Sequence, residues 1–342
     1  MDKKRLKGII CFFGLLILTL VIIAFLLINK KPVICSDGTP SETCSQVMPY
    51  FCEDGKLIEK ASICECPENS SQNLESCISS YQTNPKNISL EYTLNGKKKS
   101  IDFVLYQGAN DYISKLSSSI NQSENPSLLD FRLKNLNQQI QMQFLYPLLL
   151  EIEEITPNKE DQMRIAVSLV QNIPFESSNK TIQVGNEKIA YQRRAYEILY
   201  EQKGVCSEKS ELLVFLLREL GYNSAFIYYP LENHEAVGIK CSKKYALNNT
   251  DYCFIETTGP AIITDAKTEY LGNARLSSTP EVINISEGLT LSNNLKEFRD
   301  AKTLIKIRET MKKEGQINFI QYFQFKKIKE RYGLPDFTNY QF

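Results

Sequence analysis

The stretch from Gly204 to Gly221 constrains the fold most, because it places a cysteine directly before a helical pattern. Leucines at 212, 213, 216, 217 and 220 recur at helical spacing, and Gly221 supplies the left-handed residue that commonly ends a helix. The pattern predicts a helix that is buried on one side and carries Cys206 on its first turn. Unpaired backbone N–H groups and the helix dipole stabilise negative charge there, so Cys206 is a candidate nucleophile.

Two later segments supply partners for such a cysteine. His234 is the only histidine in 342 residues, and an imidazole is the usual acceptor of a thiol proton near neutral pH. Glu256 lies within a run of β-forming residues and could hold the imidazole in the required tautomer. The candidate catalytic residues are therefore Cys206, His234 and Glu256, in that order along the chain.

The order and context of these three residues resemble the transglutaminase-like superfamily, which belongs to the papain-like cysteine-enzyme fold. The resemblance is to a membrane-anchored microbial or archaeal type. The resemblance rests on Gly-Val-Cys at 204–206, a strand beginning at His234 and an acidic residue on the next strand. Upstream, residues 166–175 and 194–199 resemble the segments that precede the nucleophile in microbial members. One departure is Glu256, where the family usually carries Asp.

The resemblance covers about residues 160–265. It implies an α+β fold with a papain- or transglutaminase-like core, in which the nucleophile helix packs on an antiparallel sheet. Cys206 would attack an amide bond, of peptide or glutamine type, through an acyl-thioester, with hydrolysis favoured over cross-linking. Its own backbone N–H is a natural oxyanion donor, and the Gln171 amide is either a second donor or a group that caps its helix.

The alternative class is a non-catalytic, membrane-tethered binding or structural module that keeps this fold. A disulfide oxidoreductase is excluded because the chain lacks a C-x-x-C pair. We expect a protein or peptide substrate and no cofactor or metal. Equal numbers of basic and acidic residues, 40 each, give no field that would attract nucleic acid.

Residues 8–28 form 21 consecutive uncharged positions, long enough to span a bilayer as an uncleaved signal anchor. More basic residues precede this stretch than closely follow it, which places residues 1–7 in the cytoplasm. We therefore expect a single-pass cell-membrane protein, with the bilayer as a partner through residues 8–28 and the bulk of the chain extracellular.

The segment 35–80 holds six cysteines, at positions 35, 44, 52, 64, 66 and 77. Outside the cytoplasm they predict a small module with three disulfides, in one of 15 connectivities. A zinc site is the less favoured alternative, since no knuckle or histidine occurs there. The remaining chain, 86–342, is expected to form the transglutaminase-like domain.

Cys241 and Cys253 could form a fourth bridge, which would leave Cys206 as the free thiol. A regular hairpin with these two cysteines opposite one another would, however, place Glu256 opposite Gly238. That register leaves His234 roughly 13 Å away along the strand. A bulge or a curled loop would be needed to satisfy both pairings.

Local patterns predict the other elements. Asn95-Gly96 indicates a type I′ turn in a β-hairpin over 86–107. Helices are expected at 109–121, 127–155, 159–172 and, interrupted near Gly315, at 295–332. Strands are expected at 223–229, 234–241 and 252–258, with a possible edge strand at 282–285.

Overall fold

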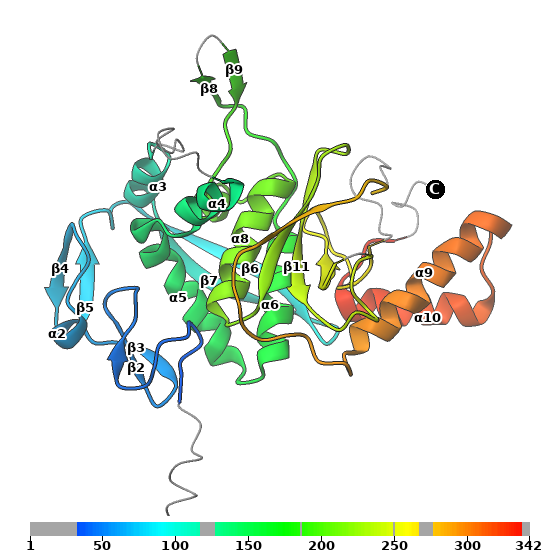
Figure 1. The fold of residues 1–342 in the computed structure, drawn as a ribbon, viewed down its shortest axis with the longest axis horizontal. Helices are drawn as coiled ribbons and strands as arrows, with labels where there is room; N and C mark the ends of the chain where they lie inside the picture. Colours follow the sequence, from blue (N-terminus) through cyan, green and yellow to red (C-terminus); the bar gives the residue numbers. More distant parts are fainter. Residues whose placement is uncertain (1–32, 117–126, 185–186, 249, 267–275, 337–342) are drawn as a thin grey trace, which may run out of the picture.

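The computed structural model describes residues 33–116, 127–184, 187–248, 250–266 and 276–336 (Figure 1). The strands of this part are divided among five separate sheets, and helices pack against the largest of them. Most buried apolar side chains form one main core, which runs from the cysteine-rich segment at Cys35 to Phe298 in a C-terminal helix.

The largest sheet is antiparallel and has the order β12-β11-β10-β13. Its strands are β10 (Ser224–Tyr229), β11 (His234–Lys240), β12 (Tyr252–Ile255) and β13 (Glu281–Asn284). Helix α8 (Cys206–Glu219) packs on β10 and β11 and presents its leucines to them. Side chains alternate between the two faces: Val237 joins the main core beneath α8, whereas its neighbour Ala236 joins a second cluster on the opposite face.

A layer of helices completes the core around α8. These helices are α3 (Gln107–Ile113), α4 (Leu128–Leu136), α5 (Gln139–Ile155), α6 (Lys159–Asn172) and α7 (Ala195–Glu201). The helix predicted over 159–172 is confirmed. The one predicted over 127–155 is instead two helices, because the first ends with its C-cap at Asn137.

Two β-hairpins flank this layer. The predicted hairpin over 86–107 is present as β6 (Pro85–Leu94) and β7 (Lys97–Tyr106), and β6 packs against α6. Asn95 and Gly96 both have positive φ, at 53° and 80°, as a type I′ turn requires. A second hairpin, β8 (Thr181–Val184) with β9 (Glu187–Ala190), was not expected from the sequence.

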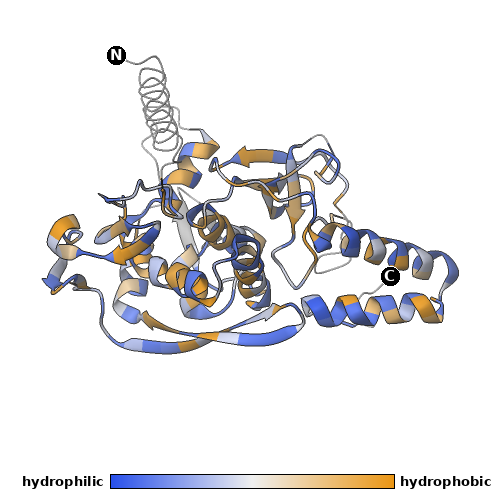
Figure 2. Ribbon diagram, turned by 90° about the horizontal axis from the view of Figure 1, so that it is seen from below, coloured by the Kyte–Doolittle hydropathy of each residue, from blue (hydrophilic) through white to orange (hydrophobic). Residues whose placement is uncertain are grey.

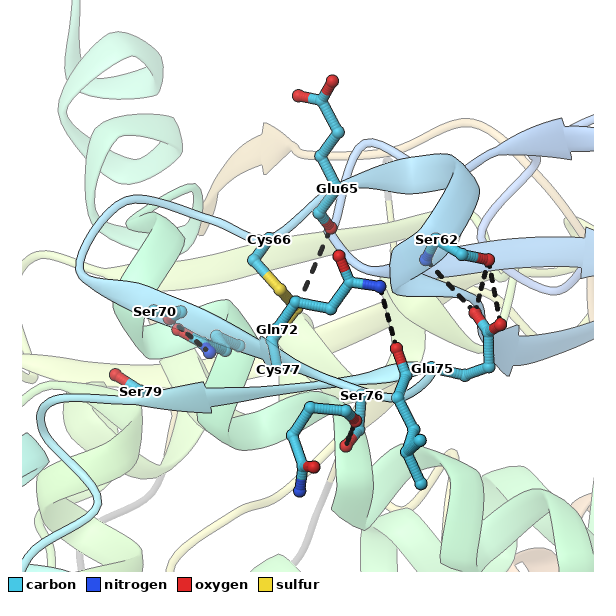
Figure 3. Close-up of a disulfide and its surroundings, with 12 residues drawn as sticks. Ser62, Glu65, Cys66, Ser70, Gln72, Glu75, Ser76, Cys77 and Ser79 are labelled. Atoms are coloured by element: carbon cyan, nitrogen blue, oxygen red, sulfur yellow. Dashed lines mark hydrogen bonds between the residues drawn. A yellow bond between two sulfur atoms is a disulfide. The ribbon is translucent and has the colours of Figure 1, made fainter.

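The cysteine-rich segment contains the three disulfides that its sequence predicts. Two of them interleave, Cys35–Cys52 and Cys44–Cys64, and cross-link the sheet formed by β1 (Thr43–Cys44), β2 (Tyr50–Glu53) and β3 (Lys56–Glu59). The third, Cys66–Cys77, spans the small hairpin of β4 (Ser70–Asn73) and β5 (Ser76–Ser79) (Figure 3). There the Glu75 carboxylate accepts hydrogen bonds from the Ser62 N–H and hydroxyl, at 3.1 and 2.7 Å.

This cysteine-rich segment is docked on the rest of the chain. The ring of Tyr50 stacks on Tyr146 of α5, with 5.3 Å between the ring centroids. The Tyr146 hydroxyl in turn donates to Glu219 of α8 at 2.7 Å. The backbone of Ser36 lies so close to Gly221 that a β-carbon there would come within 2.9 Å of the Ser36 carbonyl oxygen. The segment is therefore part of the folded body.

The Cys241–Cys253 disulfide is also present, and the register explains how it coexists with a short His234–Glu256 distance. Cys253 pairs with Ile239 rather than with Cys241, so the disulfide joins residues two positions apart in the ladder. In this register Glu256 lies two residues closer to His234 than it would if Cys241 and Cys253 were directly opposite one another. No bulge is required.

The C-terminal helices form a hairpin that projects from the body in both views (Figures 1 and 2). Helix α9 (Lys296–Glu314) ends at Gly315, whose φ is 71°, and α10 (Phe319–Tyr332) begins after the Asn318 cap. The predicted interruption near Gly315 is confirmed. A small separate core that includes Leu304, Ile307, Phe325 and Ile328 holds the hairpin together.

The fold class predicted from the sequence, a papain- or transglutaminase-like core with a transmembrane helix, needs correction. In the ranges given above, the fold is α+β with several sheets, and no helix is both long and apolar enough to cross a membrane. The longest helix among the described residues, α9, has 19 residues, of which eleven are charged. The span expected at residues 8–28 lies outside the described residues.

Candidate active site

Cys206 stands at the first turn of α8, as its sequence context predicts. The turn is fixed from within by Glu208, whose carboxylate accepts the Val205 N–H at 2.9 Å. The same carboxylate is held by Arg193, through its backbone N–H at 2.7 Å and its guanidinium at 2.9 Å. Arg193 and Glu208 are each only 1% exposed, so a buried ion pair anchors the segment that carries Cys206.

Cys206 is the free cysteine among those that the structure describes, and its side chain is partly accessible. Eight other cysteines are paired in disulfides, and Cys11 lies outside the described residues. A reactive thiol must be both unpaired and reachable, and Cys206 meets both conditions.

His234 and Glu256 meet at the open end of the β11–β12 pair. His234 is the first residue of β11, and Glu256 directly follows the last residue of β12. The imidazole Nε2 lies 3.0 Å from Glu256 Oε2, and both side chains are buried. Because Nε2 is engaged by the carboxylate, Nδ1 is the nitrogen left to interact with Cys206, whose thiol contributes to the raised pKa of the imidazole.

Glu256 is fixed by its own chain as well as by the histidine. Its Oε1 accepts the backbone N–H groups of Thr257 and Thr258, both at 2.9 Å, and the Thr258 hydroxyl at 2.8 Å. The longer arm of glutamate is folded back onto the residues that follow it, so it still reaches His234. Burial raises the pKa of Glu256, but the bonds to His234 and Thr258 outweigh this and hold the pKa below its usual value.

The pKa of His234 reflects these two neighbours. Burial alone lowers it, because the charged imidazolium is poorly solvated. The hydrogen bonds to Cys206 and Glu256, and the negative charge that each can carry, raise the pKa to about 9. The arrangement therefore stabilises the protonated imidazole, which is the state that follows proton transfer from a thiol.

Small polar contacts fix α8 relative to the two strands that carry these groups. The Ser210 hydroxyl lies 3.2 Å from the Glu235 carbonyl oxygen and 3.2 Å from the Thr257 hydroxyl. These contacts connect the helix to β11 and to the segment after β12. No local pattern in the sequence marks Ser210 or Thr257 for this role.

Lys209 is a second feature of the site that no local sequence pattern predicts. It lies one helical turn after Cys206 and is fully buried. Its ammonium donates to the carbonyl oxygens of Ile173 at 2.6 Å, Thr258 at 3.2 Å and Gln171 at 3.4 Å. Burial lowers its pKa to about 7, although the charge of Glu256 opposes that shift. Lys209 thus ties the α6 end and the Thr258 segment to the nucleophile helix.

Gln171 is not positioned as an oxyanion donor. Its side-chain amide donates to the carbonyl oxygens of Glu256 at 2.8 Å and Ala261 at 3.1 Å. Both amide hydrogens are therefore used to brace the loop after Glu256. Of the two groups that the sequence suggests as oxyanion donors, the one that remains is the Cys206 backbone N–H at the start of the helix.

A buried pair of acids lies behind the histidine. Glu235 forms an ion pair with Arg132, and Glu211 of α8 raises the pKa of Glu235 through its charge. Burial is the main cause that raises the pKa of both acids to about 7, and Arg132 opposes it. Read locally, both acids look like solvated charges, because charged residues rarely occupy buried positions, so the sequence alone does not mark them.

The described residues contain no group of three or more His, Cys, Asp or Glu side chains arranged to hold a metal ion. The site consists instead of one thiol, one imidazole and one carboxylate.

Comparisons with known proteins add a weak structural likeness. No protein-family model matches the chain, and no curated protein matches it. Among solved structures, Legionella pneumophila LapG aligns with a TM-score of 0.25 and 16% identity, over 60% of this chain and 96% of that chain. Calcium-bound LapG from the same organism aligns with a TM-score of 0.23 and 12% identity, over 57% of this chain and 98% of its own. These values are too low to define a family, so function must be argued from the site.

Proposed function

We propose that the chain is a transglutaminase-like cysteine enzyme that cleaves amide bonds, of peptide or glutamine type, in a protein or peptide substrate. The observation that carries the proposal is the 3.0 Å contact of His234 Nε2 with the buried Glu256 carboxylate, together with the free thiol of Cys206, which acts on the same imidazole by raising its pKa. A histidine that interacts with both a free thiol and a buried carboxylate can move a proton and remain oriented. No cofactor takes part.

In the first half of the reaction, His234 takes the proton from Cys206. The thiolate sulfur attacks the carbonyl carbon, and the oxyanion forms beside the Cys206 backbone N–H. His234 then gives its proton to the departing nitrogen as the C–N bond breaks, which leaves an acyl-thioester. In the second half, His234 takes a proton from water, the hydroxide attacks the thioester, and the proton returns to the sulfur. Glu256 stays ionised and orients the ring throughout.

Hydrolysis is favoured over cross-linking because water is the default acceptor of the acyl group. An amine acceptor would need a binding feature of its own beside the thioester. We also infer that the described part works in an oxidising compartment, since its four disulfides would not persist in a reducing one.

Alkylation of Cys206 by iodoacetamide tests the proposed pair without knowledge of the substrate. We expect the full chain to be alkylated at Cys206 with a pH dependence that changes in His234→Ala, and the rate at neutral pH to fall at least roughly tenfold. Cys206→Ser gives the background, and Lys203→Ala is a matched surface control that leaves the rate unchanged. Alkylation that is identical in His234→Ala would instead favour a non-catalytic binding module.

A screen of amide substrates should follow only if that result is obtained. Release of ammonia from glutamine peptides would indicate cleavage of a glutamine-type amide. The appearance of new N-termini would indicate cleavage of a peptide bond. Loss of either activity in Cys206→Ser would assign it to this site.

A further inference from the structure

The outer end of the α9–α10 hairpin, residues 311–327, exposes an unusual group of large apolar side chains. We call it the hairpin tip. Phe319, Ile320, Tyr322 and Phe323 are 74%, 68%, 52% and 50% exposed. The rings of Phe319 and Phe323 pack edge to face at 4.4 Å, and Tyr322 adjoins Phe323 at 5.9 Å, so the group forms one continuous patch.

The patch lies on the side of α10 that the hairpin core does not use. Phe325 and Ile328 face α9 and are buried in the small core. Phe319, Phe323 and Lys327 follow one another at intervals of four residues, so they share a different face of the helix. Burying this much apolar surface would be favourable, yet packing within the hairpin leaves it exposed to solvent.

The charge around the patch indicates what covers it. Lys312, Lys313, Lys326 and Lys327 are exposed in the hairpin tip, whereas Glu314 is its single carboxylate. The whole hairpin, residues 296–332, holds eleven basic and five acidic residues, a net charge of +6 in a chain whose total charge is zero. The basic charge is therefore concentrated on the projecting element.

We propose that the hairpin tip docks on the surface of a bilayer that contains anionic lipids. The apolar patch would enter the boundary between headgroups and acyl chains, and the four lysines would lie at the headgroup level. Long lysine side chains can bury their stems while the ammonium stays with the phosphates. An anionic bilayer satisfies the aromatic, aliphatic and basic side chains together.

The absence of tryptophan from the chain allows a local test. In the variant Phe319→Trp, the new residue is the only tryptophan, so its fluorescence reports on the hairpin tip alone. With the full chain, we expect emission to move to shorter wavelength on phosphatidylglycerol-containing vesicles and not on pure phosphatidylcholine vesicles. Leu74→Trp is the matched control, because Leu74 is 85% exposed in the cysteine-rich segment, and its emission should not change.

Adding Lys326→Gln and Lys327→Gln to the Phe319→Trp variant tests the role of charge. Each lysine near an anionic surface contributes about a fivefold factor, so vesicle partitioning should weaken roughly 25-fold at low salt. The proposal is overturned if anionic vesicles cause no shift, if neutral vesicles cause an equal shift, or if Leu74→Trp responds equally. A shift that appears without vesicles as protein concentration rises also overturns it, because a second copy of the chain would then cover the patch.

Discussion

The candidate active site and the α9–α10 hairpin use charge in opposite ways. At the site, ionisable groups are buried and paired: His234 with Glu256, Arg193 with Glu208, and Lys209 with three carbonyl oxygens. On the hairpin, lysines and aromatic side chains face solvent around a small core. A buried charge that loses its partner is costly, whereas an exposed side chain can be replaced at little cost. The site is thus constrained by stability, while the hairpin surface is free to be shaped by binding.

The largest effect is expected from breaking the buried pair beneath Cys206. Arg193→Leu leaves Glu208 buried without its cation, which should lower the free energy of unfolding by about 3–5 kcal/mol. The matched control is Lys203→Ala, which removes the more exposed Lys203–Glu176 pair and should cost less than about 1 kcal/mol. Urea unfolding of both variants checks the contrast. Equal losses would mean that burial of the pair contributes nothing.

Shortening one buried leucine in each core should show whether the main body and the hairpin unfold independently. Leu213→Ala in α8 removes a fully buried side chain and should cost about 2–5 kcal/mol in global stability. Leu304→Ala in the hairpin core should instead lower hydrogen-exchange protection in α9 and α10 with little change in β11. If Leu304→Ala reduced protection equally in both regions, the hairpin and the body would form one cooperative unit.

Stability at the site should depend on pH through His234. Its pKa is raised from about 6.5 when unfolded to about 9 in the fold, so the folded state binds more protons between these values. The resulting stabilisation is fully present below pH 6.5 and is lost as pH rises through 9, by roughly 1–3 kcal/mol. Denaturant unfolding of wild type and His234→Gln across this range measures it.

The difference between the two curves is the relevant quantity, because Glu211 and Glu235 also have raised pKa values of about 7. A difference that is constant with pH would show that the protonated imidazole is not stabilised by its neighbours.

The smallest effect on stability is expected at the hairpin tip. Phe323→Ser replaces a half-exposed ring outside the hairpin core, so the free energy of unfolding should change by no more than about 0.5 kcal/mol. Phe325→Ser, two residues away but buried, is the control and should destabilise the hairpin clearly. Thermal unfolding of the pair decides whether the patch is dispensable for folding.

The sequence was most informative where a local pattern has one physical reading. The helix at Cys206, the Asn95-Gly96 turn and the break at Gly315 all depend on residues within a few positions of one another. The sequence also indicated that Cys241 and Cys253 pair, but not the ladder register that reconciles this disulfide with the His234–Glu256 contact. Register is set by packing on both faces of the sheet, which no local pattern contains.

The groups missed at the site share a single cause. Lys209 and the Glu211–Glu235 pair look like solvated charges when read locally, and only the assembled core buries them. The role of Gln171 could not be predicted either, since its closeness to the Glu256 backbone cannot be read along the chain. Long-range contacts of this kind decide what a polar side chain does.

The contact of Tyr50 with Tyr146 affects how the chain can be synthesised and folded. The two interleaved disulfides can close once Cys64 has been made, but the surface on which Tyr50 docks is built from residues about a hundred positions later. The cysteine-rich segment must therefore wait with its apolar face uncovered while α5 and α8 are still being synthesised. Contacts this distant in sequence form slowly, so the docking of this segment, which is made before α5 and α8, should be a late step of maturation.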